Sequence, residues 1–242
     1  MKRLIQLKQK GFTLIELLVV APVMILTIII MMSFLFNQYG QLTQEGARLK
    51  LVTNAQIITL NVEDDVYLAS SFVSQMNNNL QDSYAPSGGW KYNTTPQTFI
   101  ISAVALTTNS RNPARKPVYI NTVGCDPSVL ENNSELQNNI IYFVQGTKLY
   151  KRIVTAPPSL QTCGSSYEKQ TCPSANVTTT CPTDKLMTDK LNSFSITYYD
   201  SSGTVTTVPE QAQKVKISVQ LKDKAFAEDV YGDANITVKK LN

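Results

Sequence analysis

One acidic residue stands inside the most apolar stretch of the sequence. Between Phe12 and Phe36 the only charged residue is Glu16. A carboxylate inside a membrane span costs about 2.5–3.5 kcal/mol on insertion scales, so it needs a partner of opposite charge. Hydrolysis of the peptide bond after Gly11 would create such a partner, a free amine on Phe12, four residues before Glu16. A proteolytic cut after Gly11 is therefore one way in which the chain could supply the partner of Glu16.

The apolar stretch is long enough to cross a membrane. Residues 12–36 would form a helix of about 37 Å, whereas the hydrocarbon core of a bilayer is about 30 Å thick. Four basic residues precede this segment and none lies inside it: Lys2, Arg3, Lys8 and Lys10. This asymmetry predicts a single-pass membrane protein with a cytoplasmic N-terminus and an exported remainder.

Two simpler interpretations compete with processing at Gly11. An ordinary secretory signal has an apolar core of about 7–15 residues closed by a small-residue cleavage site. Here the apolar run is longer, and no such site closes it. A plain signal anchor would explain the length of the run but neither Gly11 nor Glu16.

The sequence from Gly11 to Glu16, Gly-Phe-Thr-Leu-Ile-Glu, resembles the processing site of type IV prepilins and type II secretion pseudopilins. The resemblance implies that a prepilin peptidase cuts after Gly11, that Phe12 is N-methylated, and that Glu16 acts in assembly. It also implies the partners: membrane lipid before assembly, an inner-membrane assembly platform, and other pilins or pseudopilins in a filament. The assembled filament would lie at the cell surface or in the periplasm.

Beyond the span, apolar residues recur at steps of three and four up to about residue 76, which predicts an amphipathic continuation of the same helix. Asn77-Asn78-Asn79 would stop it. Pro22 within the span, and Gly40 and Gly46 after it, are either flexible points or tolerated exceptions. The predicted segments are a cleaved leader at 1–11, a membrane and assembly half of the helix at 12–36, an amphipathic half at 37–76, and an exported globular β-rich domain at 77–242.

The sequence of the exported part predicts short strands and turns, so the expected fold class is α+β. The resemblance to type IV pilins implies that the long helix packs on an antiparallel sheet. We expect strands at 98–104, 116–123, 139–144, 149–154, 193–199, 205–208, 215–221 and 234–241. Their order resembles that of the larger minor pilins and pseudopilins, the J-type of secretion systems and the W-type of pili. This implies a minor subunit rather than the abundant subunit of a filament shaft.

Four cysteines, Cys125, Cys163, Cys172 and Cys181, all lie in the part predicted to be exported. An even number outside the cytoplasm predicts disulfides, and four cysteines allow three pairings. Of these we favour Cys125–Cys163 with Cys172–Cys181. A four-thiolate zinc site is the alternative, although the sequence lacks the C-x-x-C pairs typical of such sites.

Residues that could support an enzyme are scarce. The chain has no histidine, which removes the commonest general base and metal ligand. The run Glu63-Asp64-Asp65 occupies consecutive helix positions that point in different directions, so a solvated helix face is the simplest interpretation. We therefore expect no enzymatic activity, no cofactor and no metal site.

Two features leave room for a binding role, such as that of a pilus-tip adhesin or a DNA-uptake pilin. Trp90 follows two glycines in an expected loop, where it forms either a binding surface or a lid that packs onto the helix; we favour the lid. Two short basic clusters could meet DNA, one of Arg111, Arg115 and Lys116 and the other of Lys148, Lys151 and Arg152. Net charge adds nothing to the case for DNA, because loss of the leader leaves 18 Lys and Arg to balance 18 Asp and Glu.

Overall fold

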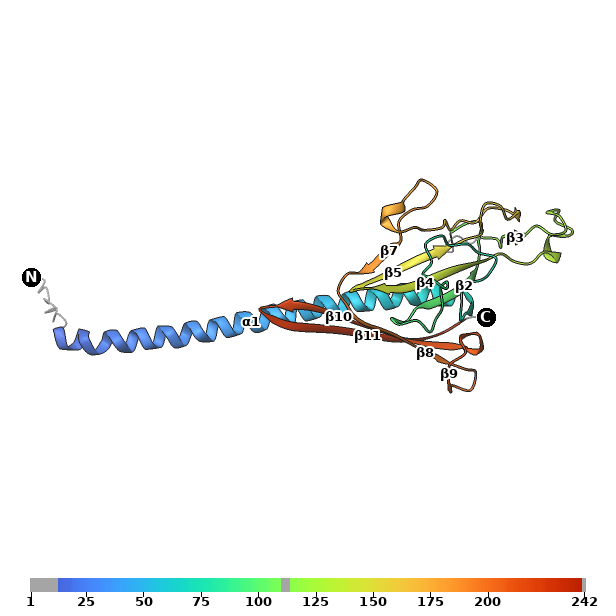
Figure 1. Ribbon diagram of the computed structural model, residues 1–242. Coiled ribbons are helices and arrows are strands. Elements are labelled where there is room, and N and C mark those ends of the chain that lie inside the picture. The colour runs from blue at the N-terminus through green and yellow to red at the C-terminus, as the bar shows by residue number, and fades with distance from the viewer. Residues whose placement is uncertain (1–12, 110–113, 241–242) are drawn as a thin grey trace, which may run out of the picture.

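The computed structural model describes residues 13–109 and 114–240. The predicted processing site at Gly11 and Phe12 lies outside the described residues, as does Arg111. Within them the chain has the expected α+β architecture, one long N-terminal helix packed against antiparallel sheets (Figure 1).

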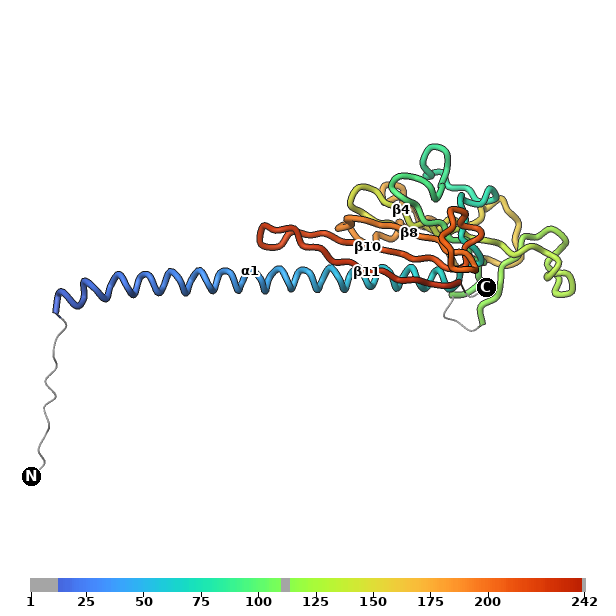
Figure 2. Tube along the Cα trace, turned by 90° about the horizontal axis from the view of Figure 1, so that it is seen from below, coloured from blue at the N-terminus to red at the C-terminus, as the bar shows by residue number. Residues whose placement is uncertain are grey.

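Helix α1 runs without a break from Leu14 to Tyr67, about 81 Å at 1.5 Å per residue. Its first half projects beyond the β-rich domain and its second half lies along that domain (Figures 1 and 2). Pro22 lies inside the helix without ending it. The hydroxyls of Thr27 and Ser33 donate to the carbonyl oxygens of Met24 and Ile29, at 2.8 and 2.9 Å. These polar side chains are thus satisfied within the helix, as lipid surroundings require.

The second half of α1 is amphipathic, as its periodicity predicts. Its buried apolar residues follow one another at steps of three or four: Leu51, Ala55, Ile58, Val62 and Val66. This face packs against β10 and β11, and the same core cluster includes residues of both large sheets. Burial of this stripe, rather than helix propensity, holds the helix on the domain.

The helix ends nine residues before the expected position at 76. Leu68 caps it, and Ala69–Phe72 forms strand β1, which pairs antiparallel with β2. Ala69 and Phe72 are both fully buried, and the Phe72 ring packs against those of Phe99 and Tyr198. The helical spacing of apolar residues continues through Ala69 in the sequence, so the helix was predicted to be too long. Strand pairing and aromatic packing outweigh this local periodicity.

The larger sheet has five strands in the order β1-β2-β4-β5-β7. The other bounds are β2 at Phe99–Val104, β4 at Gln137–Gln145, β5 at Lys148–Val154 and β7 at Lys185–Thr188. The strands predicted at 139–144 and 149–154 are confirmed as β4 and β5, which form an antiparallel hairpin; Gly146 at its turn has a φ of 63°. Strand β7 was not expected from the sequence.

The second large sheet has four strands in the order β11-β10-β8-β9. Their bounds are β8 at Leu191–Tyr199, β9 at Val205–Thr206, β10 at Lys214–Ala225 and β11 at Glu228–Lys239. Alternate residues of β10 are buried from Val215 to Leu221, as the alternating sequence predicts. A two-stranded ribbon pairs β3, Tyr119–Ile120, with β6, Thr162–Cys163, so the strand expected at 116–123 is much shorter. Short 3₁₀ helices occupy η1 at Leu130–Asn132, η2 at Ser174–Asn176 and η3 at Pro209–Gln211.

Both faces of the five-stranded sheet are covered. Phe99 and Tyr142 face the helix and belong to the main core, whereas Ile100 and Ile141 point the other way into a second apolar cluster with Trp90. Residues of the segment between β1 and β2 cover this second cluster. Strands covered on both sides carry nearly continuous apolar runs, and residues 99–104, interrupted only by Ser102, and 140–144 follow this pattern.

Candidate functional site

The projecting half of α1 forms one continuous apolar surface. From Leu14 to Tyr39 every residue is exposed, and Leu14 and Ile15 are 83% and 77% exposed. The helix contains one segment long and apolar enough to cross a membrane, and nothing in the structure buries that segment. An apolar surface of this size in water exceeds by far the patches found on soluble monomers. It requires either lipid or other apolar helices around it.

Glu16 lies at the start of this surface and takes part in a capping box with Thr13. The backbone N–H and the hydroxyl of Thr13 both donate to Glu16 Oε2 at 2.9 Å, and the Glu16 N–H donates to Thr13 Oγ1 at 3.3 Å. Among the described residues the carboxylate has no cationic partner. Thr13 directly follows Phe12 in the chain, so the capping box holds the negative charge beside the predicted new N-terminus.

The acidic run at the end of α1 is not the uniformly solvated face expected from the sequence. Asp65 accepts a hydrogen bond from the buried Tyr142 hydroxyl and pairs with Lys151 at 2.5 Å. Burial, reinforced by the charge of Asp65, raises the pKa of Tyr142 well above its usual value. Asp65 therefore joins the helix to the five-stranded sheet, and of its neighbours only Asp64 is exposed.

Trp90 is a lid, as favoured, but it covers the opposite side of the sheet from the helix. Its side chain is 6% exposed, and its ring lies 4.8 Å from that of Phe143 on β4. The indole N–H donates to Asp82 Oδ2 at 2.6 Å. The expected packing of this lid onto the helix is wrong, because the five-stranded sheet stands between them.

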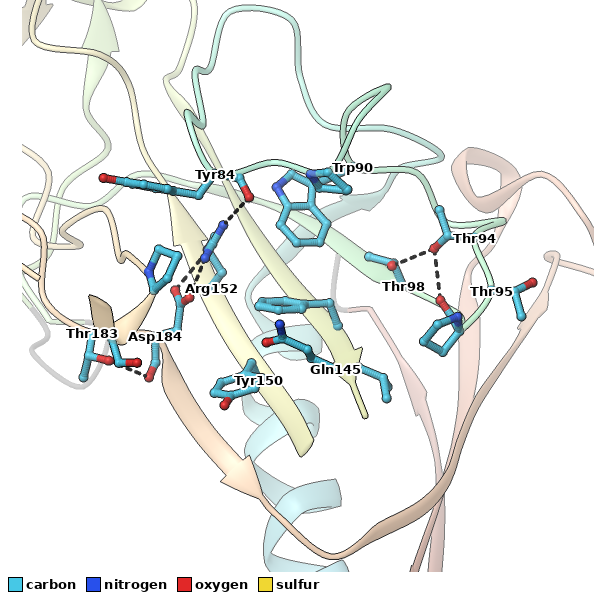
Figure 3. A pocket seen from close by; sticks show the side chains of 16 residues that line it. Tyr84, Trp90, Thr94, Thr95, Thr98, Gln145, Tyr150, Arg152, Thr183 and Asp184 are labelled. Carbon is cyan, nitrogen blue, oxygen red and sulfur yellow. Dashed lines mark hydrogen bonds and ion pairs between the residues drawn. The ribbon is translucent and has the colours of Figure 1, made fainter. Parts of the chain in front are cut away.

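A buried ion network lies next to Trp90 (Figure 3). Arg152 donates from Nε and Nη2 to the two carboxylate oxygens of Asp184, at 3.0 and 2.5 Å, and from Nη1 to Asp82 at 3.0 Å. All three side chains are at least 95% buried. Burial acts to lower the pKa of Arg152, but the hydrogen bonds and charges of the two aspartates outweigh it and raise that pKa.

From the sequence, Arg152 was placed in a basic cluster and this network was missed, although the alternation along β5 could have indicated it. Tyr150, Arg152 and Val154 share one face of the strand, and Val154 is fully buried in the second apolar cluster. An arginine beside a buried valine needs buried carboxylates. Asp82 and Asp184 lie 70 and 32 residues away in sequence, so nothing local points to them.

This network forms one end of a cavity of about 480 Å³ on the outer face of the five-stranded sheet. Trp90, Phe143 and Tyr150 supply aromatic walls, and the rings of Phe143 and Tyr150 are stacked 5.5 Å apart. Further lining comes from Tyr84, Pro86, Thr94, Thr95, Pro96, Thr98, Val144, Gln145, Pro173, Ser174 and Thr183. Aromatic walls with a few hydroxyl and amide groups are typical of small-ligand pockets.

Two of the three residues in the second basic cluster form ion pairs within the fold. Lys151 pairs with Asp65, and Arg152 is held by Asp82 and Asp184, which leaves Lys148 at the exposed β4–β5 turn. A stripe of phosphate contacts therefore finds little support at this position.

The four cysteines form the two favoured disulfides, Cys125–Cys163 and Cys172–Cys181, with Cα–Cα distances of 5.4 and 5.7 Å. Oxidised sulfurs offer no thiolate to zinc, so the four-thiolate alternative is wrong. Disulfides also fit an oxidising, extracytoplasmic environment for this part of the chain.

No protein-family model matches the chain, and no curated protein is significantly similar to it in sequence. The class is therefore defined by architecture alone. A long N-terminal helix with an exposed apolar first half, whose second half packs on antiparallel sheets, is a pilin-like arrangement.

Proposed function

We propose that this protein is a minor pilin or pseudopilin subunit, processed after Gly11, N-methylated at Phe12, and assembled through α1 into a type IV pilus or a type II secretion-like filament. The observation that carries the proposal is the fully exposed apolar half of α1 with a single carboxylate at its start. This surface has two suitable environments, a bilayer before assembly and a bundle of like helices afterwards.

Glu16 supplies the charge that aligns neighbouring helices. After processing, the amine of Phe12 and the Glu16 carboxylate become complementary, within one subunit or between two. At an effective dielectric constant of about 20 and a separation of about 4 Å, the attraction is roughly 4 kcal/mol before desolvation is subtracted. Apolar helix packing then holds the fibre together, and the ion pair mainly sets the register.

The exported domain supports a minor subunit. Two long loop regions, between β1 and β2 and between β5 and β7, lie on the side of the sheet away from α1. They cover the second apolar cluster and line the cavity. A subunit with such additions is better suited to a filament end or to contact with a partner than to a uniform shaft.

Mass spectrometry of native protein tests the proposal directly. In cells with an active prepilin peptidase, the mature chain should begin with methylated Phe12, and it should be found with other pilins and the inner-membrane assembly platform. The Gly11→Ala variant should keep its leader. An intact leader on the unaltered protein in such cells would refute the filament-subunit assignment and leave an anchored exported domain.

The aromatic cavity favours a second candidate function, a ligand-binding role at a filament tip. Tyr150→Ala would remove one stacked wall while leaving the helix and its assembly surface intact. Filaments at normal abundance with lost surface adherence would support this role. Adherence unchanged by Tyr150→Ala would count against it.

A DNA-uptake role has a separate test. The detergent-solubilised full chain should shift DNA in a gel, and the shift should weaken steeply as salt rises, because phosphate contacts release counterions. An absent or salt-insensitive shift would exclude that role.

A further inference from the structure

The turn between β10 and β11 is built from unusual residues. Ala225 pairs with Glu228, so the loop consists of Phe226 and Ala227 alone, and both have positive φ values, 51° and 68°. Two-residue turns with positive φ at both positions normally use Asn or Gly, because a Cβ atom is strained there. Backbone strain at two residues that both carry side chains points to a functional role for the Phe226 ring.

The turn places the Phe226 ring on helix α1 at Gly40. A Cβ atom at Gly40 would lie 3.1 Å from two ring carbons, and Gly40 is the first buried residue of the helix. Tyr39 meets the same ring edge-on, with centroids 6.4 Å apart. Gly40 therefore provides the space in which the Phe226 ring packs on the helix, and it is not a flexible point. Much of both rings stays in contact with the surroundings, since Phe226 is 53% and Tyr39 65% exposed.

Most charged residues behind the turn have partners within the fold, whereas Lys224 is exposed. Lys222 and Asp229 form an ion pair across the hairpin at 2.7 Å, Asp223 pairs with Lys190, and Glu228 accepts a hydrogen bond from Gln44. The tip itself, residues 225–227, is apolar. What the hairpin presents at its end is thus an uncharged aromatic surface.

The position of this surface matches the edge of a bilayer. Leu17 to Phe36 is an uncharged run of 20 residues, about 30 Å of helix, which equals the hydrocarbon thickness. Gly40 lies about 6 Å further along the helix, within a headgroup layer about 5–7 Å deep. In both views the β10–β11 turn is the part of the domain that reaches furthest toward the projecting half of α1 (Figures 1 and 2).

We propose that Phe226 and Tyr39 form an aromatic anchor that sits in the headgroup layer of the outer leaflet while the subunit is stored in the membrane. Tyrosine is enriched in this layer, and phenylalanine is among the apolar residues that interfacial helices bury at the boundary between headgroups and acyl chains. The anchor fixes the depth of the span and holds the exported domain against the membrane surface. This inference rests on the proposed membrane residence of α1. Lys224, one residue before the apolar tip, is exposed, so anionic lipid adds an attraction, but the aromatic contact itself does not require it.

Tryptophan fluorescence of the full chain in vesicles tests the anchor. The chain has one tryptophan, Trp90, whose emission in the unaltered protein serves as background. Reporters are Phe226→Trp and, in case a larger ring above Gly40 perturbs the hairpin, Ala227→Trp. Leu26→Trp marks the middle of the span, and Val205→Trp marks an exposed site on β9. Vesicles of phosphatidylethanolamine and phosphatidylglycerol carry nitroxide lipids labelled either at the headgroup or at mid-chain.

The anchor predicts that the headgroup label quenches most of the emission added at 226 or 227, that the mid-chain label quenches Leu26→Trp, and that neither label affects Val205→Trp. If Leu26→Trp is quenched but both turn reporters behave like Val205→Trp, the anchor is refuted and the membrane residence of α1 stands. Loss of quenching at Leu26→Trp as well would overturn membrane residence itself. Turn emission that neither label quenches, but that shifts to longer wavelength when protein is diluted in lipid, would assign the aromatic surface to a neighbouring subunit and refute the anchor.

Discussion

The backbone of Gly232 on β11 rests directly on the helix at Leu51. A Cβ atom at position 232 would lie 2.5 Å from Leu51 Cβ and 2.5 Å from the backbone nitrogen of Val52. Neither atom belongs to a flexible side-chain end, so Gly232→Ala must push the strand away from α1. We expect the free energy of unfolding to fall by about 1–3 kcal/mol, the usual range for overpacking. Chemical denaturation of the full chain in detergent, followed by circular dichroism, measures it.

Gly46→Ala is the matched control for this change. Gly46 lies within α1, and an added Cβ would meet nothing within 4 Å. Alanine is favoured over glycine in a helix by about 1 kcal/mol, so this variant should be more stable than the unaltered protein. Equal stability of the two alanine variants would contradict the close approach of β11 to the helix.

Arg152 should be the charged residue least tolerant of substitution. Arg152→Met would leave Asp82 and Asp184 buried without their cation, and removal of one partner from a buried ion pair costs about 3–5 kcal/mol. The measurement is the denaturation midpoint, together with the emission of Trp90, whose indole N–H is bonded to Asp82.

Lys222→Met provides the comparison for Arg152→Met. Lys222 and Asp229 also form an ion pair, but both side chains are more than one third exposed. Water and salt screen an exposed pair, which therefore contributes little, so this variant should be nearly as stable as the unaltered protein. Similar losses for the two methionine variants would show that burial does not set the importance of Arg152.

Sequence patterns predicted the elements whose signals are local. The helical stripe of α1 and the alternation of β10 both follow from periodicity, and the β4–β5 turn follows from Gly146. The β10–β11 turn was missed because Phe226-Ala227 has no turn signature; the strands on either side were expected to stop at 221 and to begin at 234. A turn made without Gly or Asn can be recognised only once the pairing of the strands is known.

The remaining differences come from long-range contacts. Strand β1 reads as helix until its pairing with β2 and the packing of Phe72 are known. The Arg152 network joins three segments that are far apart in sequence, so the cavity beside it has no sequence motif. The role of Glu16, in contrast, stays a prediction that rests on no tertiary information, because a lone charge in an apolar run is conspicuous in the sequence itself.

The two disulfides should differ in their effect on stability. Cys125–Cys163 closes a loop with a sequence separation of 38, and Cys172–Cys181 one with a separation of 9. Loop-closure entropy predicts losses of about 4 and about 2.6 kcal/mol when each pair is replaced by serine. Denaturation of the two double variants measures the difference. A larger loss for the Cys172–Cys181 pair would show that native packing, not the unfolded chain, dominates.

Stability should depend on Glu210 at acidic pH. Burial acts to raise the pKa of Glu210, but hydrogen bonds from the side chain and backbone of Ser74, the latter from its N–H at 2.6 Å, together with one from the Glu210 backbone, outweigh it and hold that pKa below its ordinary value of 4.5. A lowered carboxyl pKa stabilises the fold above pH 4.5 and loses this effect as pH falls through the lowered value. In Glu210→Gln the decline in unfolding free energy below pH 4.5 should be shallower. Identical pH profiles for the two proteins would show that the hydrogen bond does not favour the ionised form.

Glu16 has two separable roles, and two substitutions distinguish them. Glu16→Gln keeps a side-chain oxygen that can accept from the Thr13 N–H, so the helix cap persists, but it removes the charge. Glu16→Ala removes both. If the carboxylate acts by pairing with the amine of Phe12, both variants should be processed normally and both should assemble into few filaments, counted by electron microscopy of sheared cell-surface material. If only the cap matters, the Gln variant should assemble like the unaltered protein, and the charge-pairing mechanism would be wrong.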